Sequence, residues 1–348
     1  MELRNGERTS IVITSIFPPT EAVMAFAKMD DHDLVVAGDK KTPADWQHEN
    51  VSYLSVERQK GIGKHLNAVL PYNHYCRKMM GYLHAIQSGA SLIVDTDDDN
   101  IPKDNWTFPH FEGSFQTIPG YKGFVNIYQL YTDAPIWPRG LPLDLIRKKF
   151  DLEADIATQH MKVGMWQGLA DEDPDVDAIY RLTSDTPVYF KQREPVVLGK
   201  GTICPFNTQN TLVRKEFFAL MYLPTYVTFR FTDILRSLIA QPIMWLYDCH
   251  LGFVDATVVQ KRNPHDYFKD FVSEIPMYLH TSKVVDITIG AISAANSLHD
   301  NLYNAYEALM KHEIVEAKEL LVLEAWLKDL DHYSKADQPE EASTVFVG

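Results

Sequence analysis

The sequence has few cysteines and no long apolar run, and each shortage excludes a class of protein. Its three cysteines, Cys76, Cys204 and Cys249, are odd in number and widely spaced, so they match neither a disulfide framework nor a zinc site. No apolar run approaches the roughly 20 residues that span a bilayer. The first ten residues, MELRNGERTS, also lack the apolar centre of a signal peptide. We therefore expect a soluble chain in a reducing compartment, the cytoplasm.

Positive charge is scarce as well. Lysine and arginine together number 33 against 47 acidic residues, which gives a formal net charge of −14 at pH 7. Such a chain lacks the basic surface that non-specific nucleic-acid binding and docking on anionic membranes require. An anionic substrate would need a local cluster of cations or a bound metal ion. The 348 residues, 45% of them apolar, are enough for a sizeable core in one large α/β domain or two small ones.

Short β-branched and apolar runs alternate with helical patterns in the first hundred residues. Strands are expected at residues 11–17, 33–39 and 51–56. A helix is expected at residues 21–28, and a longer one at residues 65–88, which ends at a glycine. Repeated strand–helix units predict an α/β fold with a mostly parallel central sheet flanked by helices.

The second half is less regular. Residues 103–200 contain many proline, glycine and tryptophan positions, which is typical of binding loops or lids. Helical periodicity dominates from about residue 286 onward, and the end of the sequence is polar. We therefore expect an α/β domain at residues 1–285, a helical extension at residues 286–332 and a disordered tail at residues 333–348.

The most informative stretch is SLIVDTDDDN, residues 91–100. An apolar run stops abruptly at Asp95, Asp97, Asp98 and Asp99, as in a buried strand that delivers acids to its exposed carboxyl end. Crowded carboxylates repel one another unless a cation offsets their charge. Oxygen ligands without nearby histidine or cysteine favour Mg²⁺ or Mn²⁺. The alternative is a solvated acidic turn or a helix cap.

Other polar residues follow expected elements. Asp39 ends the second strand, where nucleotide-binding α/β folds place a residue on the base or ribose. Arg77 and Lys78 are adjacent cations one helix before the acidic stretch, which makes them candidates for diphosphate contacts. Asp233 begins an apolar helix and could be only its N-cap. Each of these residues could also be an ordinary loop or surface residue.

Six segments together resemble the STELLO glycosyltransferase-like proteins of plants. They are IVITSIFPPTEAV, RKMMGYLHAIQSGASLIVDTDDDN, PIWPRGLPLDLI, GLADEDPDVDAIYRLT, FNTQNTLVRKEFFALMYLP and FRFTDILRSLIAQ. The similarity runs from about residue 11 to residue 285. A weaker resemblance in the same order is to the reversibly glycosylated polypeptides, which are UDP-arabinopyranose mutases. Both resemblances imply a GT-A-like (Rossmann-like) nucleotide-sugar fold, and the first implies the Golgi lumen if the chain is a fragment of an anchored protein.

The resemblance also implies roles for individual residues. Asp97 and Asp99, with His265 as a third ligand, would hold Mn²⁺ or Mg²⁺ against the diphosphate of a UDP-sugar, and Asp97 would lie near the ribose. Asp233 would be the base that deprotonates the acceptor hydroxyl of a glycan or other acceptor. The residues expected to contact the donor are Ile16, Phe17, Pro18, Asp39, Arg77, Lys78, Asp97, Asn207, Asn210 and Arg262.

Three functions follow as hypotheses. The first is a metal-dependent, inverting glycosyltransferase that binds the donor in the first half of the chain and the acceptor in the second. The second is a UDP-sugar mutase in which Arg139 takes the sugar covalently. The third is a catalytically silent GT-A module that acts as a binding partner or scaffold.

Overall fold

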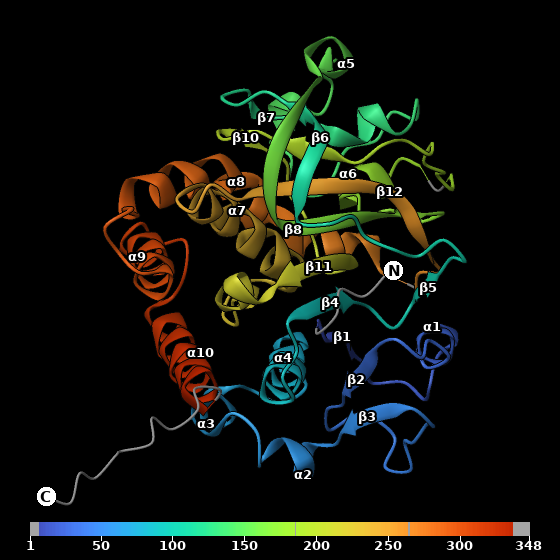
Figure 1. Ribbon diagram of the computed structural model, residues 1–348, viewed down its shortest axis with the longest axis vertical. Coiled ribbons are helices and arrows are strands. Elements are labelled where there is room, and N and C mark those ends of the chain that lie inside the picture. Colours follow the sequence, from blue (N-terminus) through green and yellow to red (C-terminus); the bar gives the residue numbers. More distant parts are fainter. Residues whose placement is uncertain (1–6, 185, 264, 337–348) are drawn as a thin grey trace, which may run out of the picture.

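A computed structural model describes residues 7–184, 186–263 and 265–336, and its centre is a ten-stranded sheet in the order β3-β2-β1-β4-β11-β8-β6-β9-β12-β5 (Figure 1). Its strands are β1 (Thr9–Thr14), β2 (Asp33–Ala37), β3 (Val51–Leu54), β4 (Leu92–Thr96), β5 (Asn100–Pro102), β6 (Glu112–Ile118), β8 (Ala157–Asp171), β9 (Val196–Leu198), β11 (Asn210–Arg214) and β12 (His250–Gln260). A separate two-stranded sheet pairs β7 (Gly123–Phe124) with β10 (Thr202–Ile203).

The α-helices are α1 (Glu21–Phe26), α2 (Val56–Gln59), α3 (Lys64–Val69), α4 (Lys78–Gln87), α5 (Leu152–Asp155), α6 (Ala178–Arg181), α7 (Thr232–Trp245), α8 (Tyr267–Ala291), α9 (Leu298–Lys311) and α10 (Ala317–Ala336). Short 3₁₀ helices are η1 (Tyr75–Arg77), η2 (Ile127–Leu130), η3 (Leu143–Leu145), η4 (Lys215–Met221) and η5 (Phe229–Phe231). In the part of the chain that the structure describes, no helix is both long and apolar enough to cross a bilayer.

Among themselves, the strands β1 to β4 pair only in parallel. The order β3-β2-β1-β4 is that of a Rossmann-like half-sheet; β1, β2 and β4 are largely buried, and the edge strand β3 is mostly half-buried. In β1, Val12 contributes to the core on one face, while Ile11 and Ile13 contribute to the core on the other. The predicted α/β class, with a GT-A-like sheet flanked by helices and helices at the end of the chain, is confirmed.

The second half of the sheet differs from the expected parallel arrangement. β11 pairs antiparallel with both β4 and β8, and β12 pairs antiparallel with β9 and β5 but parallel with β8. The sheet is therefore mixed. Its longest strand, β8, lies in the region that was expected to be irregular. Its first half is mostly exposed and polar and its second half is buried throughout, so neither half shows the alternation that marks a strand.

The expected long helix at residues 65–88 is wrong in its extent. The chain forms α3, then η1, and then α4, which begins only at Lys78. Pro71 and Asn73 lie at the break, and Asn73 has a backbone φ of 53°, outside the helical region. A proline inside a helix removes a backbone hydrogen bond and clashes with the preceding turn, which explains the interruption.

The helices at the end of the sequence begin earlier than the sequence suggested. α8 starts at Tyr267, so the expected boundary at residue 285 falls inside it. α10 extends through residue 336, and residues 337–348 of the expected tail lie outside the described residues. The division into an α/β domain and a helical extension stays a prediction.

Helix α10 connects distant parts of the chain. The N-cap residue of α3, Gly63, offers no side chain, and Asp329 of α10 instead accepts hydrogen bonds from the backbone N–H groups of His65 (3.1 Å) and Leu66 (2.7 Å). Glu319, at the other end of α10, accepts from the N–H groups of Thr225 (2.8 Å) and Tyr226 (2.7 Å). α10 therefore fixes the start of α3 and the loop before α7 at once.

Replacing Asp329 with alanine should lower the free energy of unfolding by about 1–3 kcal/mol, because two buried backbone donors lose their acceptor. The measurement is urea denaturation followed by far-UV circular dichroism. The matched control is Asp331→Ala, on the same helix as Asp329. It removes a half-exposed carboxylate that is paired with His299 of α9. That change should cost less than about 1 kcal/mol. Equal losses in the two variants would contradict a capping role for Asp329.

Candidate active site

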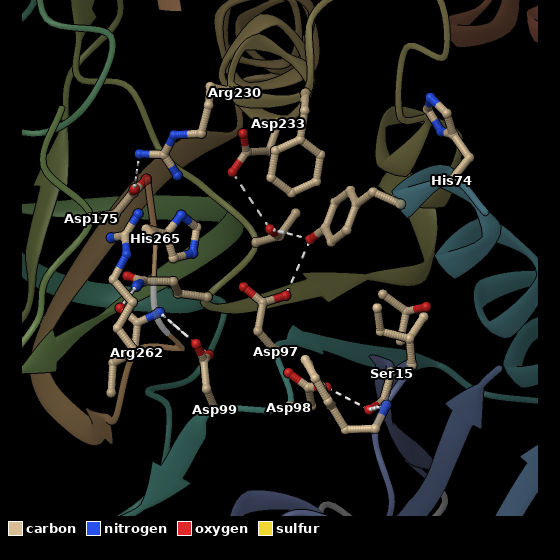
Figure 2. A pocket seen from close by; sticks show the side chains of 18 of the residues that line it. Ser15, His74, Asp97, Asp98, Asp99, Asp175, Arg230, Asp233, Arg262 and His265 are labelled. Atoms are coloured by element: carbon tan, nitrogen blue, oxygen red, sulfur yellow. Dashed lines mark hydrogen bonds and ion pairs between the residues drawn. The ribbon is translucent and has the colours of Figure 1, made fainter. Parts of the chain in front are cut away.

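A cavity of about 310 Å³ lies at the carboxyl ends of β1, β2 and β4, facing η1 and the start of α7 (Figure 2). This is the edge at which open α/β sheets bind ligands. The residues expected from the sequence that line it are Ile16, Phe17, Asp39, Asp97, Asp99, Arg139, Asp233, Arg262 and His265. The structure therefore brings most of the predicted site residues to one place.

Beneath the cavity, Asp95 is fully buried and paired with two cations. Lys78 Nζ lies 2.7 Å from one carboxylate oxygen and Arg236 Nη1 lies 2.8 Å from the other. Burial alone would lower the pKa of Lys78, but the carboxylates of Asp95 and Asp97 raise it above its ordinary value. The first acid of the stretch is thus neutralised by the protein itself.

Asp97 faces the cavity with part of its charge already compensated. Its Oδ1 accepts a hydrogen bond from Lys78 Nζ (2.9 Å) and lies 3.2 Å from the hydroxyl of Tyr75. Burial raises the pKa of Asp97 even though Lys78 opposes the shift. Lys78 itself does not line the cavity, so its expected contact with a diphosphate is replaced by a contact with Asp97.

Among the described residues, the hydrogen-bond partners of Asp98 and Asp99 are neutral. The hydroxyl of Ser15 donates to Asp98 (2.5 Å), and the side-chain amide of Gln260 donates to both oxygens of Asp99 (3.3 and 3.2 Å). Burial, reinforced for Asp99 by its two acidic neighbours, raises the pKa of Asp98 to about 6 and that of Asp99 to about 7. Uncompensated negative charge is therefore concentrated at this end of the acidic stretch.

The predicted metal ligands can be tested against this geometry. Among the described residues, no group of three or more His, Cys, Asp or Glu side chains is gathered closely enough to hold an ion by itself. Mg²⁺ is often bound by only one or two carboxylates together with substrate phosphates. The oxygens of Asp97 and Asp99 suit that mode, because no cation among the described residues pairs directly with Asp99, and only the more distant Arg262 favours its charge. His265 lines the cavity, but its Nδ1 is paired with Asp270 (2.9 Å).

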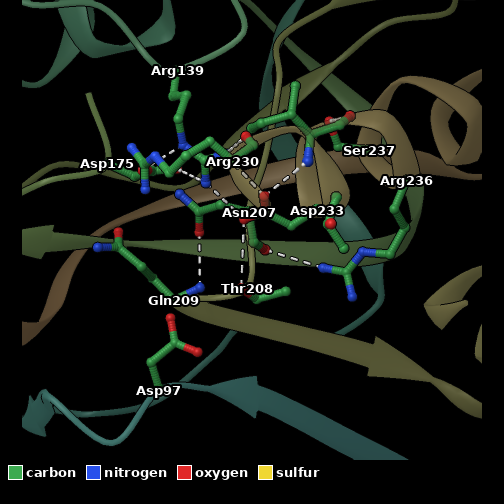
Figure 3. Close-up of polar contacts among 12 residues, drawn as sticks. Asp97, Arg139, Asp175, Asn207, Thr208, Gln209, Arg230, Asp233, Arg236 and Ser237 are labelled. Atoms are coloured by element: carbon green, nitrogen blue, oxygen red, sulfur yellow. Dashed lines mark hydrogen bonds and ion pairs between the residues drawn. The ribbon is translucent and has the colours of Figure 1, made fainter. Parts of the chain in front are cut away.

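The opposite wall is organised around Arg139 (Figure 3). Its guanidinium donates to both oxygens of Asp175 (2.8 and 2.8 Å) and to both oxygens of Asp233 (2.9 and 2.8 Å), and also to the carbonyl of Arg230. Despite burial, the two carboxylates raise the pKa of Arg139 well above its ordinary value. Arg139 is therefore a fixed cation that orients two acids.

Asp233 is not an N-cap. Helix α7 begins at Thr232 after Phe231, so Asp233 lies in the first turn with its side chain bonded to Arg139. Its Oδ2 also lies 3.5 Å from the hydroxyl of Thr208, and it lines the cavity. The capping interpretation is therefore wrong, and the carboxylate faces the same space as Asp97.

Arg262 is the most weakly paired arginine of the cavity. Its side chain is 7% exposed, its Nε has no hydrogen-bond partner among the described residues, and its nearest carboxylate, Asp270, is 3.6 Å away. Burial and the nearby Arg230 lower the pKa of Arg262. An anion beside it would relieve both penalties, so Arg262 is suited to bind one.

The residues predicted to contact the base and the ribose lie on a third side of the cavity. Ile16 and Phe17 line the cavity and are each about two-fifths exposed. Asp39 also lines it, but its two oxygens already accept from the backbone N–H groups of Lys40 (2.7 Å) and His74 (2.9 Å). Pro18, the last residue of this expected set, does not line the cavity.

Three further predictions are not supported by the positions of the side chains. Arg77 is completely buried, donates to Gln59 and Asn67, and does not line the cavity. Asn207 and Asn210 also lie behind the cavity wall. Asn210 donates to Thr257 (2.8 Å), and Asn207 accepts from the backbone N–H of Gln209 (2.9 Å). These side chains stabilise the scaffold because their elements direct them into the core.

The cavity residues that sequence reasoning missed include Tyr75, Asp175, Thr208, Arg230 and Gln260. Asp175, Thr208 and Arg230 fall within segments that carried the STELLO resemblance, and this resemblance was the sequence feature that could have identified them as site residues. Burial and the carboxylates of Asp97 and Asp95 raise the pKa of Tyr75 well above its ordinary value, so its hydroxyl stays protonated. Gln260 ends β12, and its place beside Asp99 depends on sheet pairing that the local sequence does not reveal.

Comparisons with known proteins agree with the resemblance. A family model described as STELLO glycosyltransferases matches residues 230–336. "Probable glycosyltransferase STELLO1" of Arabidopsis thaliana is 26% identical over 343 residues, and "Probable glycosyltransferase STELLO2" of the same plant is 25% identical. Each alignment covers 92% of this chain and 44% of the relative, so the chain spans less than half the length of these relatives.

A solved structure, "Crystal Structure of a Mycobacterial Protein", is similar with a TM-score of 0.40 and 11% identity, over 80% of this chain and 76% of that one. The family model and the two curated relatives give no support to the mutase resemblance. They do support the resemblance to the STELLO glycosyltransferases. The predicted resemblance to the STELLO-type glycosyltransferases is therefore confirmed.

Proposed function

We propose that this chain is a glycosyltransferase that moves a sugar from a nucleoside diphosphate to an acceptor hydroxyl. The nucleoside diphosphate we propose is UDP. The observation that carries the proposal is the composition of the cavity. Carboxylates at the end of β4 face a wall that holds Asp233, Arg230 and Arg262. Such a cavity can bind a metal–diphosphate group on one side and activate a hydroxyl on the other.

The donor is best accommodated along the first half of the chain. Ile16 and Phe17 offer exposed apolar surface for a base, and Asp39 lies beside them. The diphosphate then lies near Asp99 and Arg262, the acid and the cation of the cavity whose charges are least compensated. The sugar follows toward Asp233.

A divalent ion is the natural partner of Asp99. In this proposal Asp97 and Asp99 would hold Mg²⁺ or Mn²⁺ together with donor phosphates, and His265 is a candidate third ligand. The ion would supply neutralisation of the charge that develops on the departing diphosphate. Arg262 would contribute to the same neutralisation from the opposite wall.

On the acceptor side, Asp233 is the proposed base. Its two oxygens are oriented by Arg139, which is itself fixed by Asp175, so little reorganisation is needed when a hydroxyl arrives. A carboxylate held in this way can accept the acceptor's proton as the new bond forms. Direct attack by the acceptor would invert the configuration at the sugar carbon.

The mutase alternative is less compatible with the geometry. A covalent arginine–sugar intermediate requires a neutral guanidinium nitrogen, and Arg139 is fixed between two carboxylates that raise its pKa. A silent binding module would use the same cavity without turnover. Incubation with Mn²⁺ and a panel of nucleotide sugars separates the three functions by the product found: nucleoside diphosphate, a ring isomer, or neither.

Metal-dependent donor binding should strengthen as pH rises from 6 to 8. The raised pKa of Asp99, about 7, means that the free carboxyl is protonated below pH 7 and must lose a proton to bind the ion. The dissociation constant should then change by up to about tenfold per pH unit below 7. Calorimetry with UDP-glucose and Mn²⁺ measures this cleanly, because a sugar-capped diphosphate does not titrate in that range.

The matched variant for this experiment is Asp99→Asn, which keeps the size of the side chain but has no proton to lose. It should bind the donor weakly and with a flat pH profile. Wild-type binding that is unchanged by a chelator, or equal in the Asn variant, would remove the metal from the proposal.

Asp233→Asn should lower turnover by about 10²-fold or more and leave donor affinity nearly unchanged, because it removes the proton acceptor on the acceptor side. The matched control is Asp175→Asn, which also disturbs Arg139 but leaves the proposed base intact. Its loss of turnover should be clearly smaller. Equal losses would show that Asp233 acts only by holding Arg139.

A further inference from the structure

Two hydroxyl groups lie between Asp97 on the donor side of the cavity and Asp233 on the acceptor side. The hydroxyl of Tyr75 lies 3.2 Å from Oδ1 of Asp97 and 2.5 Å from Oγ1 of Thr208. The hydroxyl of Thr208 lies in turn 3.5 Å from Oδ2 of Asp233. A continuous path of polar contacts therefore runs from the end of β4 to the first turn of α7.

The hydrogen bonds along this path can all be donated in the same direction, from Tyr75 through Thr208 to Asp233. Lys78 Nζ donates to Asp97 (2.9 Å) and lies within 3.4 Å of the Tyr75 hydroxyl, which can accept from it. The Tyr75 hydroxyl is then free to donate along the shorter contact to Thr208, and the Thr208 hydroxyl can donate to Asp233. Each hydroxyl both accepts and donates, as is usual for buried side chains of this kind.

The bridge is held rigidly at both ends. Thr208 is 3% exposed, and the residues before and after it are fixed through the backbone N–H groups of Asn207 and Gln209 (3.0 and 2.9 Å to side-chain acceptors). The ring of Tyr75 packs edge-on against Phe229 at 5.5 Å between centroids. η5, which contains Phe229, immediately precedes α7, which carries Asp233, so this packing connects the same two sides again.

We propose that Tyr75 and Thr208 are positioning residues that set the separation of Asp97 and Asp233, and so align the bound donor with the base. The inference rests on the proposed transferase function. It assigns these two hydroxyls no contact with the reacting atoms. Their effect is on the geometry in which donor and acceptor meet, where a displacement of about 1 Å can cost about 10²-fold in rate.

The decisive variants are Thr208→Val, which keeps the shape but removes the hydroxyl, and Thr208→Ser, which keeps the hydroxyl. We expect Thr208→Val to lower kcat at least tenfold while the donor dissociation constant, measured by calorimetry, changes less than threefold. Thr208→Ser should retain kcat within threefold of the wild type. Tyr75→Phe should resemble Thr208→Val, and the double variant should be no slower than either single variant, because both remove one bridge.

Several results would overturn the inference. They are wild-type kcat in Thr208→Val, an equal loss in Thr208→Ser, or a loss of donor affinity as large as the loss of kcat. Additive losses in the double variant would also contradict a single bridge. If Thr208→Val does not fold, Tyr75→Phe carries the same comparison. A wild-type protein that binds but never transfers sugar from any nucleotide sugar overturns the proposed function and this inference together, whereas an active wild type with a neutral Thr208→Val overturns the inference alone.

Discussion

The buried ion pairs of Asp95 hold this structure together at its centre. The carboxylate lies at the end of β4, Lys78 comes from α4 and Arg236 comes from α7, and all three side chains are almost completely withdrawn from water. Removing charges from water is expensive, and losing one partner of such a group leaves another charge buried and uncompensated. β4, α4 and α7 must therefore take their mutual positions together. Those positions place Asp97 and Asp233 on facing walls of the cavity.

The acidic stretch illustrates what a local pattern can and cannot reveal. An apolar run ending in acids correctly predicted a buried strand with a cavity at its carboxyl end. Repulsion among the acids correctly suggested that cations were needed, but the sequence could not show that Lys78 and Arg236 supply part of that charge. The cations of Asp95 and Asp97 come from helices whose approach depends on the whole fold. Among the described residues, Asp98 and Asp99 are paired with neutral side chains and with no cation.

The failures have the same origin. Arg77 and Lys78 are neighbours in the sequence, but Arg77 ends η1 and Lys78 begins α4. Arg77 points into a buried network with Gln59, and Lys78 points toward Asp97. The mixed half of the sheet was missed because β8 combines an exposed polar half with a uniformly buried half. The resemblance indicated Asp233 as a site residue, but it did not show that Asp233 pairs with Arg139, which lies 94 residues away in the sequence. Pairings at such distances follow from topology and not from any short motif.

Helix α10 has a consequence for how the molecule forms. The donors that Asp329 caps lie in α3, more than 260 residues earlier in the chain. A ribosome therefore releases the parallel half-sheet and α3 long before their final partner exists. Until α10 emerges, the start of α3 has water as its only acceptor, and the loop at Thr225 lacks the carboxylate of Glu319. The loop before this part of the cavity wall therefore gains its final contacts only after α10 has been made, and a chain without α10 exposes groups that chaperones can bind.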